Sequence, residues 1–343
     1  MRVVFILDKY ESKTGSYYSI VSGLVNYFLK KKIIVNILTS DLKKKNKKKF
    51  YNLISKSDIC HFFGGWSFFH IVSFFIATKL KKVRIIHPMG FYEPWALQQK
   101  KLKKKLAWYL YQKKILSEAD LIHCASNKEK KNLLNLNQSF NTKVLPFGIA
   151  KKFISIKKEK KILYKKALFF SRIHPVKGIE TLVDCWKKLD NKDWILDVVG
   201  PKENKYFYNK IQKLIGNSNN TINYLKPVFT DFEKIKLFNN YDLLILPSKN
   251  ENFSMVVLES LGRGLPVLTT TETPWKIIKY YNAGWIINPK RSSLLLCLKN
   301  IFKLDFKNFN LKSNNAINVA KNFQIEHVYK NYIKTYLELL KKK

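Results

Sequence analysis

The stretch LLILPSKNENFSMVVLE, residues 243–259, contains a strand, a turn and the start of a helix in direct succession. The apolar run 243–246 predicts a strand buried on both faces, as in the centre of a parallel sheet. Pro247 ends this strand, and apolar residues at helical spacing follow it. Two carboxylates lie eight positions apart, with Glu251 in the turn and Glu259 two turns into the helix. A strand that leads into a helix in this way predicts an α/β domain with its ligand site at the carboxyl end of the strand.

The same alternation of short apolar runs and longer amphipathic runs extends along the whole chain, as in βαβ units. In the first half we expect strands near 2–7, 33–38, 58–63, 83–87, 120–124 and 143–145, and helices near 16–31, 67–80, 94–116 and 126–135. The lysine-rich residues 151–166 are interpreted as a domain junction. After it we expect strands near 167–171, 194–200, 221–224, 242–247 and 266–269, helices near 178–189, 203–215, 230–239 and 253–263, and several C-terminal helices. The pattern predicts an α/β protein of two doubly wound parallel-sheet domains, residues 1–150 and 151–323, with a shared site in the cleft between them.

The composition is that of a folded protein. A length of 343 residues suits two ordinary domains, and 46% hydrophobic with 14% aromatic residues excludes general disorder. The four cysteines lie far apart without metal-binding spacing, so we expect buried free thiols in a reducing compartment. The apolar run 3–7 is too short for the core of a signal peptide and predicts a first strand. We therefore expect a cytoplasmic protein.

The charge of the chain is strongly positive. Its 64 Lys and Arg residues against 24 Asp and Glu residues give a formal net charge of +40. Such a surface attracts phosphate-rich partners, whether nucleic acid, anionic lipid or a phosphorylated substrate. Because nearly all of the excess is lysine, a coding bias toward AT-rich codons explains it equally well. Arginine is rare, so each arginine indicates a place where the planar, bidentate guanidinium group is needed.

A second strand-to-helix segment, SRIHPVKG at residues 171–178, contains one of these arginines. Arg172 follows a predicted strand and Lys177 precedes a predicted helix. From there the two side chains can converge on a diphosphate, with Arg as a bidentate clamp and Lys as a point charge. The alternative is two surface cations in a lysine-rich protein, and for Lys177 taken alone it is the better interpretation.

Together the two segments resemble the motifs of the retaining glycosyltransferases of family 4, which have the GT-B fold. The resemblance rests on an Arg-x4-Lys motif, Arg172 and Lys177, and on a Glu-x7-Glu motif, Glu251 and Glu259, in the family's order and domain. Similar stretches occur elsewhere: FYEPWAL at 91–97, DLIHCAS at 120–126, LPFGI at 145–149, GIETL at 178–182 and GLPV at 264–267. The resemblance covers nearly the whole chain and implies two Rossmann-like domains that face a central cleft. It also implies that the C-terminal helix, about 324–343, packs back on the first domain.

The resemblance implies a nucleotide-sugar-dependent glycosyltransferase and a role for each motif residue. Arg172 and Lys177 would bind the donor's diphosphate and stabilise the charge on the leaving nucleoside diphosphate, so that no metal ion is needed. Glu259 would accept hydrogen bonds from the ribose hydroxyls, and Glu251 would contact the hydroxyls of the transferred sugar. Backbone N–H groups at the helix N-terminus would contact the sugar or the phosphate; they belong to Phe253, Ser254 and Met255.

The sequence departs from the family in three places. Ser254 stands where the family usually has glycine, which alters the fit around the donor sugar. The first βα loop is often Gly-Gly but reads KTGS at 13–16, where Gly15 still lets the backbone approach the diphosphate. Relatives often have His or Arg before the glycine of a Ser-Pro-x-Gly stretch, whereas HPMG at 87–90 carries the imidazole two places earlier. We predict that His87 faces the acceptor as a catalytic residue; a structural histidine is the alternative.

The resemblance also implies partners. We expect a UDP- or GDP-sugar donor with a hexose-type sugar, and a glycan or lipid-linked acceptor in bacterial surface polysaccharide or lipopolysaccharide synthesis. The lysine runs 30–32, 43–49 and 100–105 favour peripheral contact with an anionic membrane, at the inner face of the cytoplasmic membrane. Leu, Trp and Tyr at 106–110 follow the last run as in an interfacial anchor, and a solvated helix face fits them nearly as well.

Two other functions fit parts of the pattern. A protein that binds nucleic acid or another anionic surface would use the same charge. Arginine is scarce, however, and no known nucleic-acid-binding motif is present, so we expect no nucleic-acid partner. A sugar-nucleotide epimerase would keep the GT-B fold, but the joint presence of the Arg-x4-Lys and Glu-x7-Glu motifs favours transfer.

Overall fold

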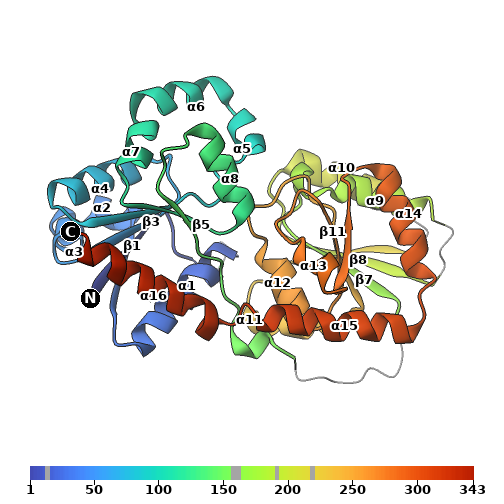
Figure 1. Cartoon of the computed structure of the whole chain (residues 1–343). Helices are drawn as coiled ribbons and strands as arrows, with labels where there is room; N and C mark the ends of the chain where they lie inside the picture. The colour runs from blue at the N-terminus through green and yellow to red at the C-terminus, as the bar shows by residue number, and fades with distance from the viewer. Residues whose placement is uncertain (12–15, 156–163, 190–192, 217–220) are drawn as a thin grey trace. The chain divides into compact units, whose positions relative to one another are not determined.

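The computed structural model of the chain describes residues 1–11, 16–155, 164–189, 193–216 and 221–343. These residues form two compact units, each built on its own parallel sheet (Figure 1). Unit 1 consists of Met1–Gly148 and Ile325–Lys343, and unit 2 consists of Ile149–Gln324. Each sheet has six strands, which confirms the predicted α/β class with two doubly wound sheets.

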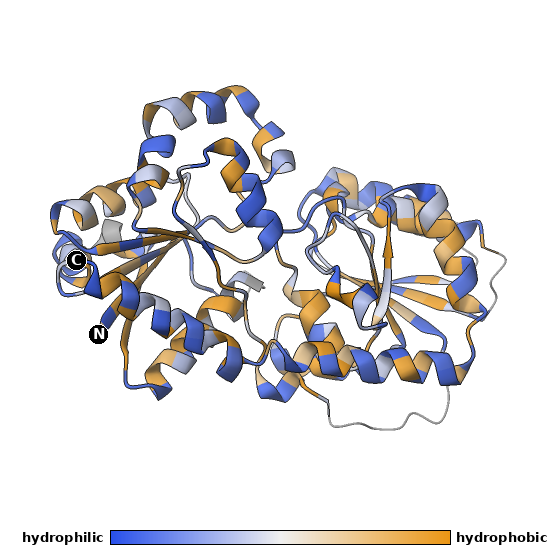
Figure 2. Cartoon of the chain, viewed as in Figure 1, coloured by the Kyte–Doolittle hydropathy of each residue, from blue (hydrophilic) through white to orange (hydrophobic). Residues whose placement is uncertain are grey.

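Unit 1 has the strand order β2-β1-β3-β4-β5-β6. The strands are β1 (Arg2–Leu7), β2 (Ile34–Thr39), β3 (Ile59–Phe63), β4 (Val83–His87), β5 (Leu121–Cys124) and β6 (Thr142–Val144). The helices are α1 (Ser16–Lys30), α2 (Ser40–Lys45), α3 (Lys47–Ser55), α4 (Phe68–Lys79), α5 (Pro94–Gln98), α6 (Lys101–Ala107), the π-helical turn η2 (Trp108–Gln112), α7 (Lys113–Glu118), α8 (Asn127–Leu136) and α16 (Ile325–Lys341). Apolar residues concentrate on the strands (Figure 2), as expected for a sheet covered on both faces.

The two faces of this sheet carry different side chains. One face packs aliphatic and aromatic residues against α3, α4, α7 and α8. The other face, under α1 and α16, carries three buried histidines on neighbouring strands: His61, His87 and His123. The hydroxyl of Tyr336 on α16 lies 2.5 Å from Nδ1 of His61, and Nε2 of His61 lies 3.2 Å from Nδ1 of His123. This polar layer within the core ties α16 to the sheet.

Unit 2 has the strand order β12-β11-β10-β7-β8-β9. The strands are β7 (Lys166–Phe170), β8 (Ile195–Val199), β9 (Ile222–Leu225), β10 (Leu243–Leu246), β11 (Val267–Thr270) and β12 (Gly284–Ile287). The helices are α9 (Ile179–Lys187), α10 (Lys205–Gly216), α11 (Asp231–Phe238), α12 (Met255–Gly262), α13 (Ile277–Tyr280), α14 (Arg291–Phe302) and α15 (Phe306–Lys321), with 3₁₀ turns η3 (Lys151–Phe153) and η4 (Pro175–Lys177). The chain builds outward from β7 to β9, then returns to the other side of β7 and builds outward from β10 to β12.

Some elements differ from the sequence expectation. Helices α2 and α3 lie between the second and third strands, where we predicted none; α3 buries only Phe50 and Ile54, too few for a clear apolar pattern. The predicted helix 94–116 breaks between α5 and α6, where Lys100 adopts a left-handed conformation with φ 53°; α6, η2 and α7 then follow one another directly. Strand β12 was not expected either. It begins at Gly284, where a Cβ would lie 2.1 Å from the carbonyl oxygen of Val267, so glycine permits the pairing with β11.

Candidate functional site

The two motif segments lie side by side at the carboxyl edge of the unit 2 sheet. β7 and β10 are neighbouring parallel strands, and the strand order reverses between them. The backbone N–H of Lys249, after β10, donates to the carbonyl of Val176, after β7, at 2.7 Å. In open parallel sheets, ligands bind outside the carboxyl ends of the strands at such a reversal point. The topology therefore brings both motifs to the edge where a ligand is expected.

Gly178 makes the close approach of these loops feasible. Its φ is +73°, in the left-handed region, and a Cβ at this position would lie 2.1 Å from the carbonyl oxygen of Pro247. Any other residue would force the two loops apart, because the atom it meets is backbone. Gly178 is also the N-cap of α9. The contact between the motifs thus depends on this one glycine.

Lys177 and Glu251 form a buried ion pair across the two loops. Nζ of Lys177 lies 2.7 Å from Oε1 of Glu251, and only 13% and 8% of the two side chains are exposed. The hydroxyl of Ser248 donates to the same carboxylate oxygen at 2.8 Å. Two donors on one oxygen hold the carboxylate in a single position. An anionic ligand at this edge therefore has to compete with Glu251 for the ammonium group.

Arg172 is not part of this pair. Its Nη1 lies 2.6 Å from Oε1 of Glu203, and both side chains are well exposed. Burial lowers the pKa of His174. The negative charge of Glu203 raises this pKa, and the positive charges of Arg172 and Lys177 lower it. Both cations therefore lie within electrostatic range of one imidazole, which sequence reasoning did not single out. Because exposed ion pairs contribute little free energy, Arg172 can exchange Glu203 for a ligand at low cost.

Helix α12 begins directly after Ser254, which has φ 69° and ψ 82°. No side chain caps the first turn of this helix. The left-handed conformation favours glycine, which accounts for the glycine that relatives usually have at this position. The indole N–H of Trp275 donates to the carbonyl of Phe253 and fixes the loop. The anion site predicted at Phe253, Ser254 and Met255 thus lies at a helix N-terminus that no side chain caps.

Glu259 lies further along α12, where it is buried and forms an ion pair with Lys234. Its Oε1 lies 2.9 Å from Nζ of Lys234 on α11. Burial raises the pKa of the Glu259 carboxyl; the Lys234 ammonium group opposes this shift, and the Asp231 carboxylate adds to it. Sequence reasoning missed Lys234. The available signal was its helical spacing from Phe238, since these are the two residues of α11 that are buried.

Asp8, Ser67 and His70 form a polar cluster at the carboxyl edge of the unit 1 sheet. The strand order of this sheet reverses between β1 and β3. The Ser67 hydroxyl donates to Oδ1 of Asp8 at 2.7 Å and lies 2.6 Å from Nδ1 of His70. The Asp8 side chain is 52% exposed, so its carboxylate remains accessible. Sequence reasoning missed this cluster; its one signal was that Asp8 ends the first strand. Gly15, predicted to contact the diphosphate, lies outside the described residues.

His87, predicted to be catalytic, is completely buried at the end of β4. Its Nδ1 lies 2.8 Å from the carbonyl oxygen of His123, so this nitrogen carries the proton. Its Nε2 has no hydrogen-bond partner among the described residues. Burial lowers the pKa of His87 to about 4, so the ring is neutral at neutral pH. The ring can therefore accept a hydrogen bond at Nε2, from a group that reaches this buried edge.

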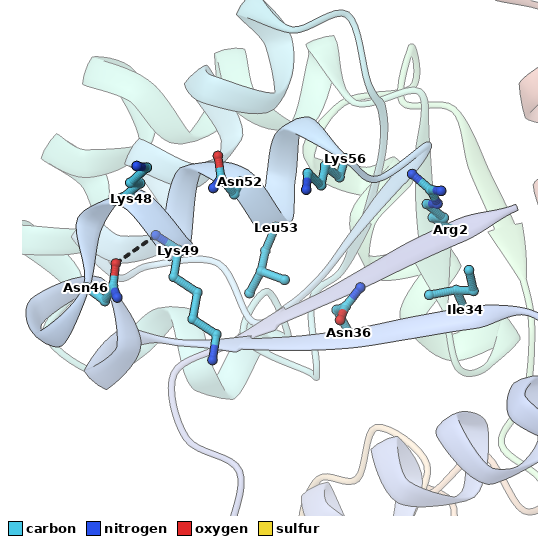
Figure 3. Close-up of a pocket in the computed structure, with 9 residues that line it drawn as sticks. All are labelled: Arg2, Ile34, Asn36, Asn46, Lys48, Lys49, Asn52, Leu53 and Lys56. Atoms are coloured by element: carbon cyan, nitrogen blue, oxygen red, sulfur yellow. Dashed lines mark hydrogen bonds between the residues drawn. The ribbon is translucent and has the colours of Figure 1, made fainter.

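Unit 1 also has a basic pocket, which Figure 3 shows. It has a volume of about 610 Å³ between α3 and the strands β1 and β2, with Arg2, Lys49 and Lys56 among its lining residues. Arg2 and Ile34 are the first residues of their strands, so the pocket lies toward the amino ends. Ligands of doubly wound sheets bind at the carboxyl ends, and we do not assign this pocket to the candidate site.

Three further observations concern metals, membranes and thiols. Within the ranges described above, no three His, Cys, Asp or Glu side chains are grouped so that they could hold a metal ion. No described helix combines the length and the apolar character needed to span a bilayer. The four cysteines are free, and Cys297 alone is not fully buried.

Comparisons with known proteins agree with this architecture. Residues 150–298 match the family model described as glycosyl transferases group 1. The structure is similar to that of Anabaena HepE in complex with UDP and glucose, with a TM-score of 0.78, 15% identity and coverage of 98% of this chain and 100% of that one. It is similar to sucrose-phosphate synthase from Thermosynechococcus elongatus, with a TM-score of 0.79, 15% identity and full coverage of both chains. It is also similar to WaaG, a glycosyltransferase involved in lipopolysaccharide biosynthesis, with a TM-score of 0.72, 16% identity and coverage of 96% and 98%. At these identities the likeness establishes the fold alone, which is GT-B. No curated protein sequence matches the chain at a significant level.

Proposed function

We propose that the chain is a glycosyltransferase, which transfers a hexose-type sugar from a nucleoside-diphosphate sugar with retention of anomeric configuration; the match of residues 150–298 to the group 1 family model supports this. In this proposal the acceptor is a glycan or a lipid-linked glycan, in bacterial surface polysaccharide or lipopolysaccharide synthesis. The observation that carries the proposal is the buried pair of Lys177 and Glu251 at the reversal point of the unit 2 sheet. It joins the Arg-x4-Lys and Glu-x7-Glu motifs at one place.

The diphosphate of the donor meets three sources of positive charge in this proposal: Arg172, Lys177 and the uncapped N-terminus of α12. When the bond between the anomeric carbon and the phosphate oxygen breaks, its electron pair goes to that oxygen. Preorganised donors aimed at the developing charge are the main electrostatic requirement of such a step. Two cations and a helix N-terminus meet this requirement, so the proposal includes no metal ion.

The remaining site residues contact the nucleotide and the sugar. Glu259 accepts hydrogen bonds from the ribose, and Glu251 from hydroxyls of the transferred sugar near the reacting carbon. The N–H groups of the Phe253, Ser254 and Met255 segment contact the sugar or the phosphate. Glu251 serves in positioning in this proposal, because Lys177 and Ser248 both donate to its Oε1.

Retention follows when the acceptor attacks from the face that the diphosphate leaves. The acceptor oxygen forms the new bond to the anomeric carbon, and its proton goes to the departing phosphate oxygen. His87 stays in the proposal as the acceptor-side catalytic residue, because its Nε2 is unpartnered within the described structure. The donor we propose first is a UDP-sugar, because the structure of HepE contains UDP and glucose; a GDP-sugar is the alternative.

Peripheral contact with an anionic membrane is supported by the surface of α6 and η2. Four large apolar side chains lie at helical spacing there and are strongly exposed: Leu102 at 84%, Leu106 at 62%, Tyr109 at 71% and Leu110 at 69%. The surrounding residues 100–105 and 113–114 contribute lysines and no acidic side chain. An apolar stripe bordered by lysines is the arrangement of a helix that lies in the interface of an anionic bilayer.

Vesicle flotation tests this contact. Vesicles with and without phosphatidylglycerol are compared for the unaltered protein and for Leu102→Ser/Leu110→Ser, with Leu296→Ser/Leu311→Ser as an equally apolar control on exposed positions of α14 and α15. We expect the first double variant to lose about 10-fold in affinity or more, from the apolar area withdrawn from the interface. Equal binding by both double variants would remove this contact from the proposal.

Turnover tests the proposal as a whole. Release of nucleoside diphosphate is measured from UDP- and GDP-sugars with water or simple glycosides as acceptors, and NMR determines the anomeric configuration of any product. Arg172→Ala and Glu259→Ala should abolish turnover without loss of fold. Arg291→Ala is the matched control, because Arg291 is also an exposed arginine in an ion pair, 3.4 Å from Asp184. Near-normal rates in the first two variants would contradict the site assignment.

A further inference from the structure

Lys234 stands apart from the other lysines of this basic chain. Among the described residues it is the only buried lysine, with 5% of its surface exposed, whereas Lys236 on the same helix is exposed. Lysine is almost never buried unless its charge is paired. The partner is Glu259, at 2.9 Å, and 4% of that side chain is exposed. A buried ammonium group against a proposed donor-binding carboxylate indicates a specific role for this lysine.

The hydrogen bonds of this pair are incomplete. Lys234 donates to Oε1 of Glu259. In the part of the chain that the structure describes, Oε2 accepts no hydrogen bond, yet this oxygen is not sealed from solvent. Two N–H bonds of the Lys234 ammonium group also have no acceptor there. Polar groups in such surroundings are normally satisfied, so the open positions suit a ligand that carries hydroxyl groups.

The charges near Glu259 make Lys234 important for its ionisation. Burial and the carboxylate of Asp231 both raise the pKa of Glu259, and Lys234 is the group that opposes them. Asp231 is itself paired with Lys152 at 2.7 Å. Removal of the Lys234 ammonium group would therefore favour the neutral carboxylic acid at Glu259. A neutral carboxyl group accepts a weaker hydrogen bond than a carboxylate does.

We propose that Lys234 is a positioning residue for donor recognition, which holds Glu259 ionised and turned so that Oε2 accepts a hydrogen bond from a ribose hydroxyl. The inference rests on the proposed function, since the ribose belongs to the donor nucleotide. It adds that an ion pair between α11 and α12, rather than one glutamate, carries the selection of ribonucleotides over deoxyribonucleotides.

The test compares the affinity of ribo- and deoxyribonucleotides by titration calorimetry. UDP and GDP are titrated beside their 2′-deoxy and 3′-deoxy forms. Loss of a hydrogen bond to a charged group costs about 1.5–3 kcal/mol, so the unaltered protein should prefer the ribonucleotide about 10- to 150-fold over one of the deoxy forms. Lys234→Met should reduce this ratio to about 2- to 13-fold, which is the range of a neutral hydrogen bond. Lys234→Arg should restore it, and the control Lys236→Met should leave it unchanged.

A pH series separates positioning from a general disturbance of the helix pair. In Lys234→Met no ammonium group opposes the rise in the pKa of Glu259 that burial and Asp231 cause, so the preference for the ribonucleotide should return as the pH rises. Glu259→Gln has no group to ionise and should show no such return. In the unaltered protein the Lys234 ammonium group opposes the effect of burial on the pKa of Glu259, so the preference should extend to lower pH than in Lys234→Met.

The results separate a failure of this inference from a failure of the proposed function. An unchanged ratio in Lys234→Met, together with a lost ratio in Glu259→Gln, would overturn the inference and leave the donor site in place. Failure of both UDP and GDP to bind the unaltered protein would overturn the proposed function itself. If Lys234→Met does not fold, Lys234→Gln keeps a hydrogen-bond donor without the charge, and the same ratio decides.

Discussion

Substitution of the two partners of the Lys177–Glu251 pair should change nucleotide binding in opposite directions. At the 2.7 Å separation, and with an effective dielectric constant of about 20, the gross attraction of the pair is about 6 kcal/mol. Desolvation of both ions cancels most of it. A diphosphate has to draw the ammonium group away from Glu251, so Glu251→Gln should tighten the binding of UDP about 3- to 10-fold. Lys177→Met loses a charge-assisted contact and should weaken UDP binding by about 1.5–3 kcal/mol.

The assay is calorimetric titration of UDP, and of GDP if UDP does not bind, into both variants and the unaltered protein. Glu203→Gln is the control, because it removes the partner of Arg172 from an exposed pair; there we expect a change of less than about 3-fold. Turnover of the full donor should fall in Glu251→Gln even as UDP binds more tightly, since the sugar contact is lost. If Glu251→Gln weakens UDP binding as much as Lys177→Met does, the diphosphate does not compete with Glu251 for the Lys177 ammonium group. Glu251 would then stabilise the loop instead.

Three further changes test other parts of the structure. Ser254→Gly should stabilise the protein by about 0.5–1 kcal/mol in chemical unfolding, because φ 69° is unfavourable for serine; no gain, or a loss, would show that the loop gains nothing from glycine there. Asp8→Asn should lower the rate of transfer while the affinity for UDP stays the same, because the exposed carboxylate lies in unit 1; a matching loss of UDP affinity would place Asp8 at the donor instead. Burial lowers the pKa of His61, His87 and His123, His87 to about 4. Below the pKa that these histidines have in the unfolded chain, unfolding therefore takes up protons. The free energy of unfolding of unit 1 should fall between pH 6.5 and about 4, by on the order of 1 kcal/mol per histidine at pH 5.5. A free energy of unfolding that stays constant across this range would contradict the buried, neutral state of the three histidines.

The strands were predictable from sequence because parallel strands buried on both faces are continuous apolar runs. β10 and β1 are such runs, and the predicted bounds of both agree with the structure to within a residue. The sequence carries less information where structure depends on distant contacts. β12 exists because Gly284 lies against Val267, and the division of the predicted helix 94–116 at Lys100 has no glycine or proline to announce it.

The site was predictable to a different extent. The resemblance to the family motifs predicted Lys177, Glu251 and Glu259 as site residues. Lys177 and Glu251 lie in segments that follow strands, and Glu259 lies within helix α12. Spacing does not say which side chains pair, and the partner Lys234 lies 25 positions before Glu259. The contact of Asp8 with Ser67 spans 59 positions. Such pairs are created by the order of strands in the sheet, which no local pattern encodes.

One titration tests whether a nucleoside-diphosphate sugar binds as donor at the unit 2 edge. UDP, GDP and their common sugar conjugates are titrated into the unaltered protein, into Arg172→Ala and into the control Arg291→Ala. We expect that one nucleotide series binds, that Arg172→Ala loses this binding and that Arg291→Ala keeps it. Absence of binding for every nucleotide, or equal binding in all three proteins, would contradict it.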